Sequence, residues 1–170
     1  MKLTETQQAA QKYLVWLLSK REYSKKQLAE KLKTRFPDEN LSAMVDWAEE
    51  QGYVSDKRFT ECYVRDKALI SGWGKQKIGF QIFQKGIDRE LFESVYEDVV
   101  EPTEVLQVAR QQATDKWKVL QKRAQQKQWS FWDTKQKLTA FLAGRGYDFD
   151  VIKAVTEAVC KEEDLDGVNV

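Results

Sequence analysis

Clusters of lysine and arginine are the residues of this sequence that could do chemistry, because cationic side chains bind phosphate and carboxylate groups. One cluster spans residues 20–35, in which the only carboxylates are Glu22 and Glu30. The net charge of the whole chain is nevertheless only +1 at pH 7. This balance argues against a surface that attracts every polyanion and favours local basic faces that contact a particular partner.

The sequence gives little support for catalysis or metal binding. It has no histidine, which removes the commonest general base and the commonest metal ligand. Cys62 and Cys160 stand apart, without the close spacing of a metal or redox motif, so we expect both to be buried apolar residues. Residues 72–75 lack the length and the Lys–Ser/Thr end of a phosphate-binding loop. We therefore predict a protein that is not an enzyme and has no metal, cofactor or small-molecule substrate.

An internal repeat must position the basic residues. One pair of offsets, from Lys25 to Lys75 and from Lys75 to Lys135, aligns three segments of the chain. The same offsets align further columns: Leu28, Ile78 and Leu138; Leu32, Ile82 and Leu142; Phe36, Gly86 and Gly146; Asp38, Asp88 and Asp148; Leu41, Leu91 and Val151; Val45, Val95 and Val155. Chance can match apolar columns but rarely keeps a lysine and an aspartate column in one register, so we predict three repeated units.

Each unit has the pattern of three helices. Apolar pairs four residues apart mark the second helix of each unit, and glycine ends it at Gly86 and Gly146. The expected N-caps of the second helices are Ser24, Gly74 and Thr134, and those of the third helices are Asp38, Asp88 and Asp148. We expect the first helices at residues 6–20, after Asp56, and at residues 103–127.

The fold class that follows is all-α: three tandem three-helix repeats, with nine helices, in an elongated, curved array. No alternation of apolar and polar residues competes as a strand pattern. The expected boundaries are residues 1–52, 53–101 and 102–160, followed by an acidic, disordered tail at 161–170.

The tryptophans have two interpretations. Trp16, Trp47 and Trp117 lie on or beside apolar helical stripes, so we expect them in the core. The remaining three lie at helix starts or turns, where partial exposure and stacking on single-stranded nucleic acid are conceivable, although packing is the stronger interpretation. They are Trp73, Trp129 and Trp132.

Stretches in all three units resemble the RecX family of regulatory proteins. In the middle unit, residues 52–59 read GYVSDKRF, residues 72–78 read GWGKQKI and residues 85–87 read KGI. Residues 23–28 are similar to the family's first-repeat start, with Gln27 in place of the usual glutamate, and residues 141–147 are similar to its third-repeat turn. The resemblance covers residues 9–158.

The resemblance implies a regulator that binds the RecA filament and inhibits recombinase, ATPase and coprotease activity in DNA repair, recombination and the SOS response. It implies DNA-bound RecA as the partner, with possible direct contact to DNA. Lys67 stands where the family usually has arginine, so a bidentate contact there is in doubt. The candidate contacts to partner or DNA are Lys25, Lys26, Arg58, Arg65, Lys67, Lys75, Lys77, Lys85 and Arg145.

Several alternatives stay open. The Lys25, Lys75 and Lys135 column could be ordinary solvated surface, and Arg58 or Arg65 could form a structural salt bridge with Asp56 or Glu61. A direct DNA- or RNA-binding helical module, independent of RecA, is the second candidate function.

We expect a cytoplasmic monomer without membrane contact. The longest apolar run, residues 13–18, is far shorter than the roughly 20 residues that span a bilayer. The first residues also lack the apolar core of a signal peptide.

Overall fold

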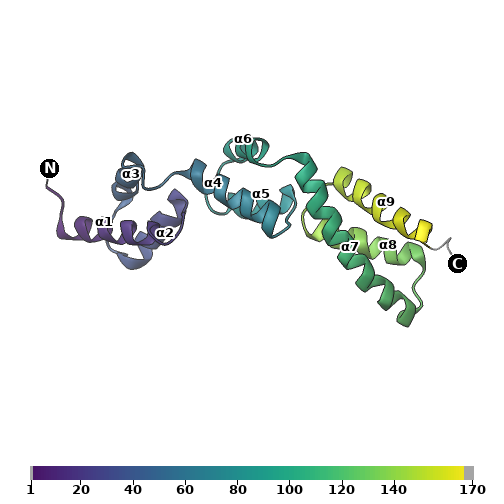
Figure 1. Cartoon of the computed structure of the whole chain (residues 1–170). Helices are drawn as coiled ribbons and strands as arrows, with labels where there is room; N and C mark the ends of the chain where they lie inside the picture. The colour runs from purple at the N-terminus through teal and green to yellow at the C-terminus, as the bar shows by residue number, and fades with distance from the viewer. Residues whose placement is uncertain (1, 167–170) are drawn as a thin grey trace. The chain divides into compact units, whose positions relative to one another are not determined.

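The computed structural model describes residues 2–166, with side chains as far as Cys160. This part of the chain is helical and contains no strand (Figure 1). Its elements are α1 (Glu5–Leu18), α2 (Lys25–Arg35), α3 (Ser42–Glu50), α4 (Asp56–Arg65), the π-turn η1 (Asp66–Ile70), α5 (Lys75–Phe83), α6 (Arg89–Val99), α7 (Pro102–Lys127), α8 (Phe131–Gly144) and α9 (Phe149–Asp166). Across residues 2–166 the predicted all-α fold with nine helices in three-helix units is confirmed.

The chain divides into two compact units. One extends to Val64 and includes Gln81–Val99, and the other contains Arg65–Phe80 and the chain from Val100 onward. The division passes through the middle three-helix repeat, whose helix α5 contributes residues to both units.

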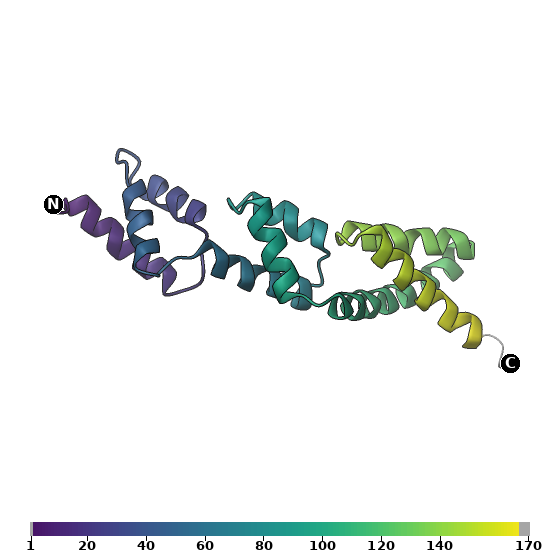
Figure 2. The same ribbon diagram turned by 90° about the horizontal axis from the view of Figure 1, so that it is seen from above.

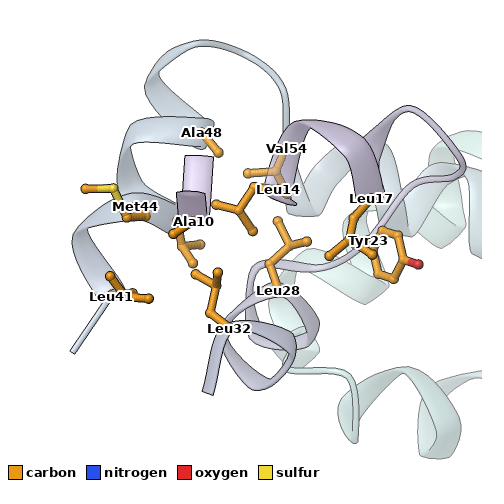
Figure 3. Packing of buried hydrophobic residues seen from close by; sticks show 11 residues of the cluster. Ala10, Leu14, Leu17, Tyr23, Leu28, Leu32, Leu41, Met44, Ala48 and Val54 are labelled. Carbon is orange, nitrogen blue, oxygen red and sulfur yellow. The ribbon is translucent and has the colours of Figure 1, made fainter. Parts of the chain in front are cut away.

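Apolar packing between α1, α2 and α3 forms the core of the first repeat (Figure 3). Leu14 and Leu28 are fully buried and point toward each other, and Leu32 lies beside them. Ala10, Leu14 and Leu17 are buried together because helical spacing places them on one face of α1.

Helices α7, α8 and α9 pack side by side as the third repeat (Figure 2). The buried face of α7 carries Ala109, Ala113, Trp117 and Leu120, which lie at helical spacing. Small alanines near the start of this face allow close approach, while the larger side chains fill the space further along. Pro102 begins α7, where it disrupts no helical hydrogen bond.

Burial confirms the two apolar columns of the second helices. Leu28, Ile78 and Leu138 have no exposed surface, and the next column, Leu32, Ile82 and Leu142, is at most 2% exposed. Burying an apolar side chain of this size contributes about 1.5–3 kcal/mol relative to leaving it in water. The columns therefore mark the positions that stabilise each three-helix unit.

The predicted caps are partly wrong. Ser24 caps α2, and the Asp88 carboxylate accepts the Leu91 N–H at the start of α6. Asp38 does not begin α3, which starts at Ser42. Thr134 does not begin α8, because Ser130 forms a capping box with Asp133 one turn earlier and the helix starts there.

Three other expectations change. Trp16 is 56% exposed rather than in the core, because it lies on the face of α1 opposite Leu14. Cys62 is exposed, whereas Cys160 is buried as expected. Helix α9 continues to Asp166, past residue 161 where the tail was expected to begin, and residues 167–170 of that tail lie outside the described part.

None of the helices in the described residues is both long enough and apolar enough to cross a bilayer.

Candidate functional site

Several of the predicted contact residues lie at two junctions, in each of which the N-terminus of one helix meets the turn that ends another. At the first junction α2 meets the turn after α5. The Ser24 hydroxyl donates to the Lys85 carbonyl oxygen at 2.6 Å. The aliphatic stem of Lys26 covers Gly86, which has a φ of +86°.

Lys25 is an internal partner at this junction. Its backbone N–H donates to Asp56 Oδ1 at 2.8 Å, so the Asp56 carboxylate caps the N-terminus of α2. Its ammonium forms an ion pair with Glu49. The hydrogen bond that the Lys25 ammonium donates to the Glu49 carboxylate raises the pKa of Lys25 above its ordinary 10.5, although burial opposes this change. Lys25 therefore contributes to the structure of the junction.

The ammonium groups of Lys26 and Lys85 lie near the surface at the first junction. Lys26 is exposed, and its ammonium donates to the Gln84 carbonyl oxygen at 3.1 Å. Lys85 is half-buried, with its ammonium 5.7 Å from the centre of the Tyr63 ring. Both retain donors that could contact an anionic partner.

Arg58 is also tied to the fold. Its Nε donates to Glu22 Oε1 at 2.7 Å, and its Nη2 donates to the Tyr53 carbonyl oxygen at 3.0 Å. A structural salt bridge was one of our alternatives, but its partner is Glu22 rather than Asp56 or Glu61. This side chain fixes the connection between α1 and α2 to the start of α4.

The second junction brings α5 to the turn after α8. The Gly74 N–H donates to the Arg145 carbonyl oxygen at 2.8 Å, and the Gln76 N–H donates to the Gly146 carbonyl oxygen at 3.2 Å. Positions 24 and 74 belong to one repeat column, and Lys85 and Arg145 belong to another. The two junctions are therefore equivalent contacts, which repeat in three dimensions the spacing found in the sequence.

A buried hydrogen-bond network surrounds the second junction. Arg145 Nε donates to Gln112 Oε1 at 2.9 Å, and its Nη2 donates to the Ser71 carbonyl oxygen at 2.6 Å. The hydroxyl of Tyr147 donates to the Gly72 carbonyl oxygen at 2.9 Å and accepts from Gln112 Nε2 at 2.8 Å. Burial raises the pKa of Tyr147 above its ordinary 10.0, against the opposing effect of Gln112. Arg145 is consequently a structural residue.

A basic and aromatic cluster lies beside this junction. The ammonium groups of Lys67, on η1, and Lys77, on α5, lie 5.0 and 4.4 Å from the centre of the Trp73 ring. Lys67 also contacts Asp66 at 3.3 Å. Two ammonium groups on one indole concentrate positive charge, and attraction to the ring holds them in place.

Arg65 and Lys75 complete the predicted set. Arg65 ends α4 with an exposed side chain that forms no ion pair within the described residues. Lys75 is half-buried at the first residue of α5. Among the nine predicted contacts, Arg65 and Lys26 are exposed, and Lys67 and Lys77 are half-buried around Trp73.

Sequence analysis missed the residues that hold the junctions together. Gln112, Glu49 and Glu22 are distant in sequence from the groups they bind, and no local pattern marks them. The only sequence feature that pointed to the junctions was the pair of glycines Gly86 and Gly146, which fall in one repeat column.

Comparison with known proteins identifies related chains. Family models described as "RecX, second three-helix domain" and "RecX, third three-helix domain" match residues 55–95 and 103–156. A protein named "Regulatory protein RecX" from Legionella pneumophila (strain Corby) is 34% identical over 149 residues, covering 84% of this chain and 89% of the relative. A protein of the same name from Cronobacter sakazakii is 30% identical over 150 residues, covering 82% of this chain and 85% of the relative.

A solved structure has a similar fold. The crystal structure of RecX from Lactobacillus salivarius superposes with a TM-score of 0.77 at 18% sequence identity, covering 92% of this chain and 98% of that one.

Proposed function

Because the chain belongs to the RecX family of regulatory proteins, we propose that it regulates the RecA recombinase without catalysing a reaction. In this proposal it binds the RecA filament on DNA and inhibits recombinase, ATPase and coprotease activity, which modulates DNA repair and the SOS response. The observation that carries the proposal is the match of two successive family models, in the order and at the repeats that the sequence predicts.

The proposed contact surface is narrower than the nine residues first considered. Arg65 and the Lys67–Lys77 pair around Trp73 would meet acidic groups of the filament or DNA phosphate. Lys26 would add a second basic contact from the first junction. Internal bonds engage Lys25, Arg58 and Arg145, so these side chains would act by holding the junctions in shape.

The proposal includes a compartment and an assembly state. A regulator of a DNA-bound recombinase works where the chromosome lies, so we place the protein in the cytoplasm as a monomer. It requires no cofactor and no small-molecule substrate.

Hydrolysis of ATP by RecA on single-stranded DNA provides the test. Purified protein added at substoichiometric ratios to RecA should lower the rate, because one regulator bound to a filament affects many protomers. The matched control is the Arg65→Glu variant at the same concentrations. An unchanged hydrolysis rate at every ratio would contradict the proposal.

A helical module that binds DNA or RNA independently of RecA is the alternative. It predicts tight binding to naked nucleic acid with a steep dependence on salt, together with no effect on ATP hydrolysis by RecA.

A further inference from the structure

A basic cleft lies between α1 and α2 of the first repeat. Its volume is about 530 Å³, within the range of sites that hold small ligands or segments of larger ones. The lining residues are Tyr13, Arg21, Tyr23, Gln27, Glu30, Lys31, Thr34 and Arg35. None of them is among the predicted contacts, and all precede the residues matched by the family models.

Two tyrosines hold the arginines of the cleft in position. The guanidinium of Arg21 lies 4.2 Å from the centre of the Tyr23 ring, and that of Arg35 lies 4.8 Å from the Tyr13 ring. Within the described residues neither arginine forms an ion pair. Guanidinium groups fixed on aromatic faces keep their N–H donors available for an anion and lose little conformational entropy on binding it.

The remaining lining groups define the charge of the cleft. Lys31 adds a third exposed cation, and Glu30 is the only carboxylate in the lining. Gln27 is engaged in the cap of α2, and the Thr34 hydroxyl donates to the Glu30 carbonyl oxygen. Three cations against one anion favour a ligand that carries more than one negative charge.

An exposed aromatic surface continues from the cleft. Trp16 is 56% exposed and stacks on Tyr13, with ring centres 6.2 Å apart and planes 15° from parallel. The Lys20 ammonium lies 5.9 Å from the Trp16 ring. A planar base could stack on such a ring only if the base is unpaired, and stacking beside a basic groove is how single-stranded nucleic acid is bound.

We propose that the α1–α2 cleft binds single-stranded DNA directly, without RecA. Arg21, Lys31 and Arg35 contact successive phosphates, and Trp16 stacks on an adjacent base. This site shares no residue with the proposed filament-contacting surface around Trp73. Its test contains no RecA, so failure of RecA inhibition and failure of this site are distinguishable.

The experiment measures fluorescence anisotropy of a labelled oligothymidylate titrated with the full chain over a range of salt concentrations. The Arg21→Gln/Arg35→Gln variant should bind more weakly, and the slope of log K against log salt should fall by about 1.4, since each single-strand phosphate contact contributes about 0.7. The matched control is Lys118→Gln/Lys122→Gln, which removes the same charge from exposed positions on α7. An equal loss of affinity in the control would overturn the proposal.

The Glu30→Gln variant provides a second test, because a misfolded protein would not bind the oligonucleotide more tightly. Removing the only carboxylate of the cleft should tighten binding of the oligonucleotide, whereas an unchanged or weaker affinity contradicts the proposed site. Trp16→Ala should weaken binding by roughly tenfold through loss of stacking. Trp132→Ala, which removes a tryptophan that is 65% exposed in the third repeat, should leave the affinity unchanged.

Competition identifies the class of ligand. Unlabelled single-stranded DNA should displace the probe at lower concentration than duplex DNA or polyglutamate. Equal displacement by polyglutamate would assign the cleft to an acidic protein segment, and equal displacement by duplex DNA would exclude the stacking role of Trp16.

Discussion

The backbones of Gly74 and Gly146 lie in direct contact. A Cβ atom at position 74 would overlap the carbonyl carbon of Gly146, and the neighbouring carbonyl of Arg145 accepts the Gly74 N–H at 2.8 Å. The start of α5 can therefore reach the turn after α8 only because both positions lack a side chain.

Gly74→Ala should lower the free energy of unfolding by about 1–3 kcal/mol, because the added methyl group forces backbone apart at the second junction. Urea unfolding followed by circular dichroism measures this change. Gly144→Ala is the control, since a Cβ at position 144 meets nothing within 4 Å and alanine favours the helix. Equal destabilisation by the two variants would show that the Gly74 contact has no special importance.

Arg65→Glu should weaken inhibition of RecA by roughly tenfold without changing stability, because an exposed charge then repels the proposed acidic partner. Arg58→Glu should instead lower the free energy of unfolding by about 1–2 kcal/mol, because it removes the bonds to Glu22 and Tyr53. Hydrolysis assays and urea unfolding on both variants separate the two effects. The contact surface is misplaced if Arg65→Glu inhibits as well as the parent chain.

Tyr147 should make the fold sensitive to alkali. Its pKa is raised by burial, so the folded state retains a proton that the unfolded state releases above the ordinary value of 10.0. The stability that the protonated Tyr147 contributes to the folded state is complete below pH 10.0 and is lost as the pH rises through the higher pKa of the folded state. Urea unfolding on either side of pH 10.0 should show a smaller alkaline loss in Tyr147→Phe than in the parent chain. Tyr53→Phe, at an exposed position, should keep the full loss.

The two thiols should react at different rates. Cys62 is exposed and Cys160 is buried, so a thiol reagent should label Cys62 rapidly in the native protein and Cys160 only on unfolding. Mass spectrometry of the labelled peptides distinguishes them, and Cys62→Ser should abolish the rapid phase. Rapid labelling of Cys160 in that variant would show that α9 opens readily.

The sequence predicted the repeat because buried columns obey a simple periodicity. Leu28, Ile78 and Leu138 must all face a core, and helical spacing is enough to find them. The long α7 was equally predictable, since its apolar stripe continues from Ala109 to Leu120 without a helix breaker.

The roles of the basic residues could not be predicted, because they depend on partners far away in the sequence. Lys25 and Arg58 resemble surface cations until Glu49 and Glu22 are placed beside them. The predicted burial of Trp16 was wrong for a related reason. A tryptophan beside an apolar stripe is usually packed, but its exposure depends on which neighbouring helix covers that side.

The N-termini of the second helices differ in a way that bears on how such chains evolve. Carbonyl groups of the following repeat accept the first N–H groups of α5, whereas α8, in the last repeat, uses its own box of Ser130 and Asp133. Duplicating an internal repeat would preserve this pattern, since the copy brings both a glycine turn and a start that fits one. A repeat copied from within the chain could therefore join its neighbours through the same backbone contacts.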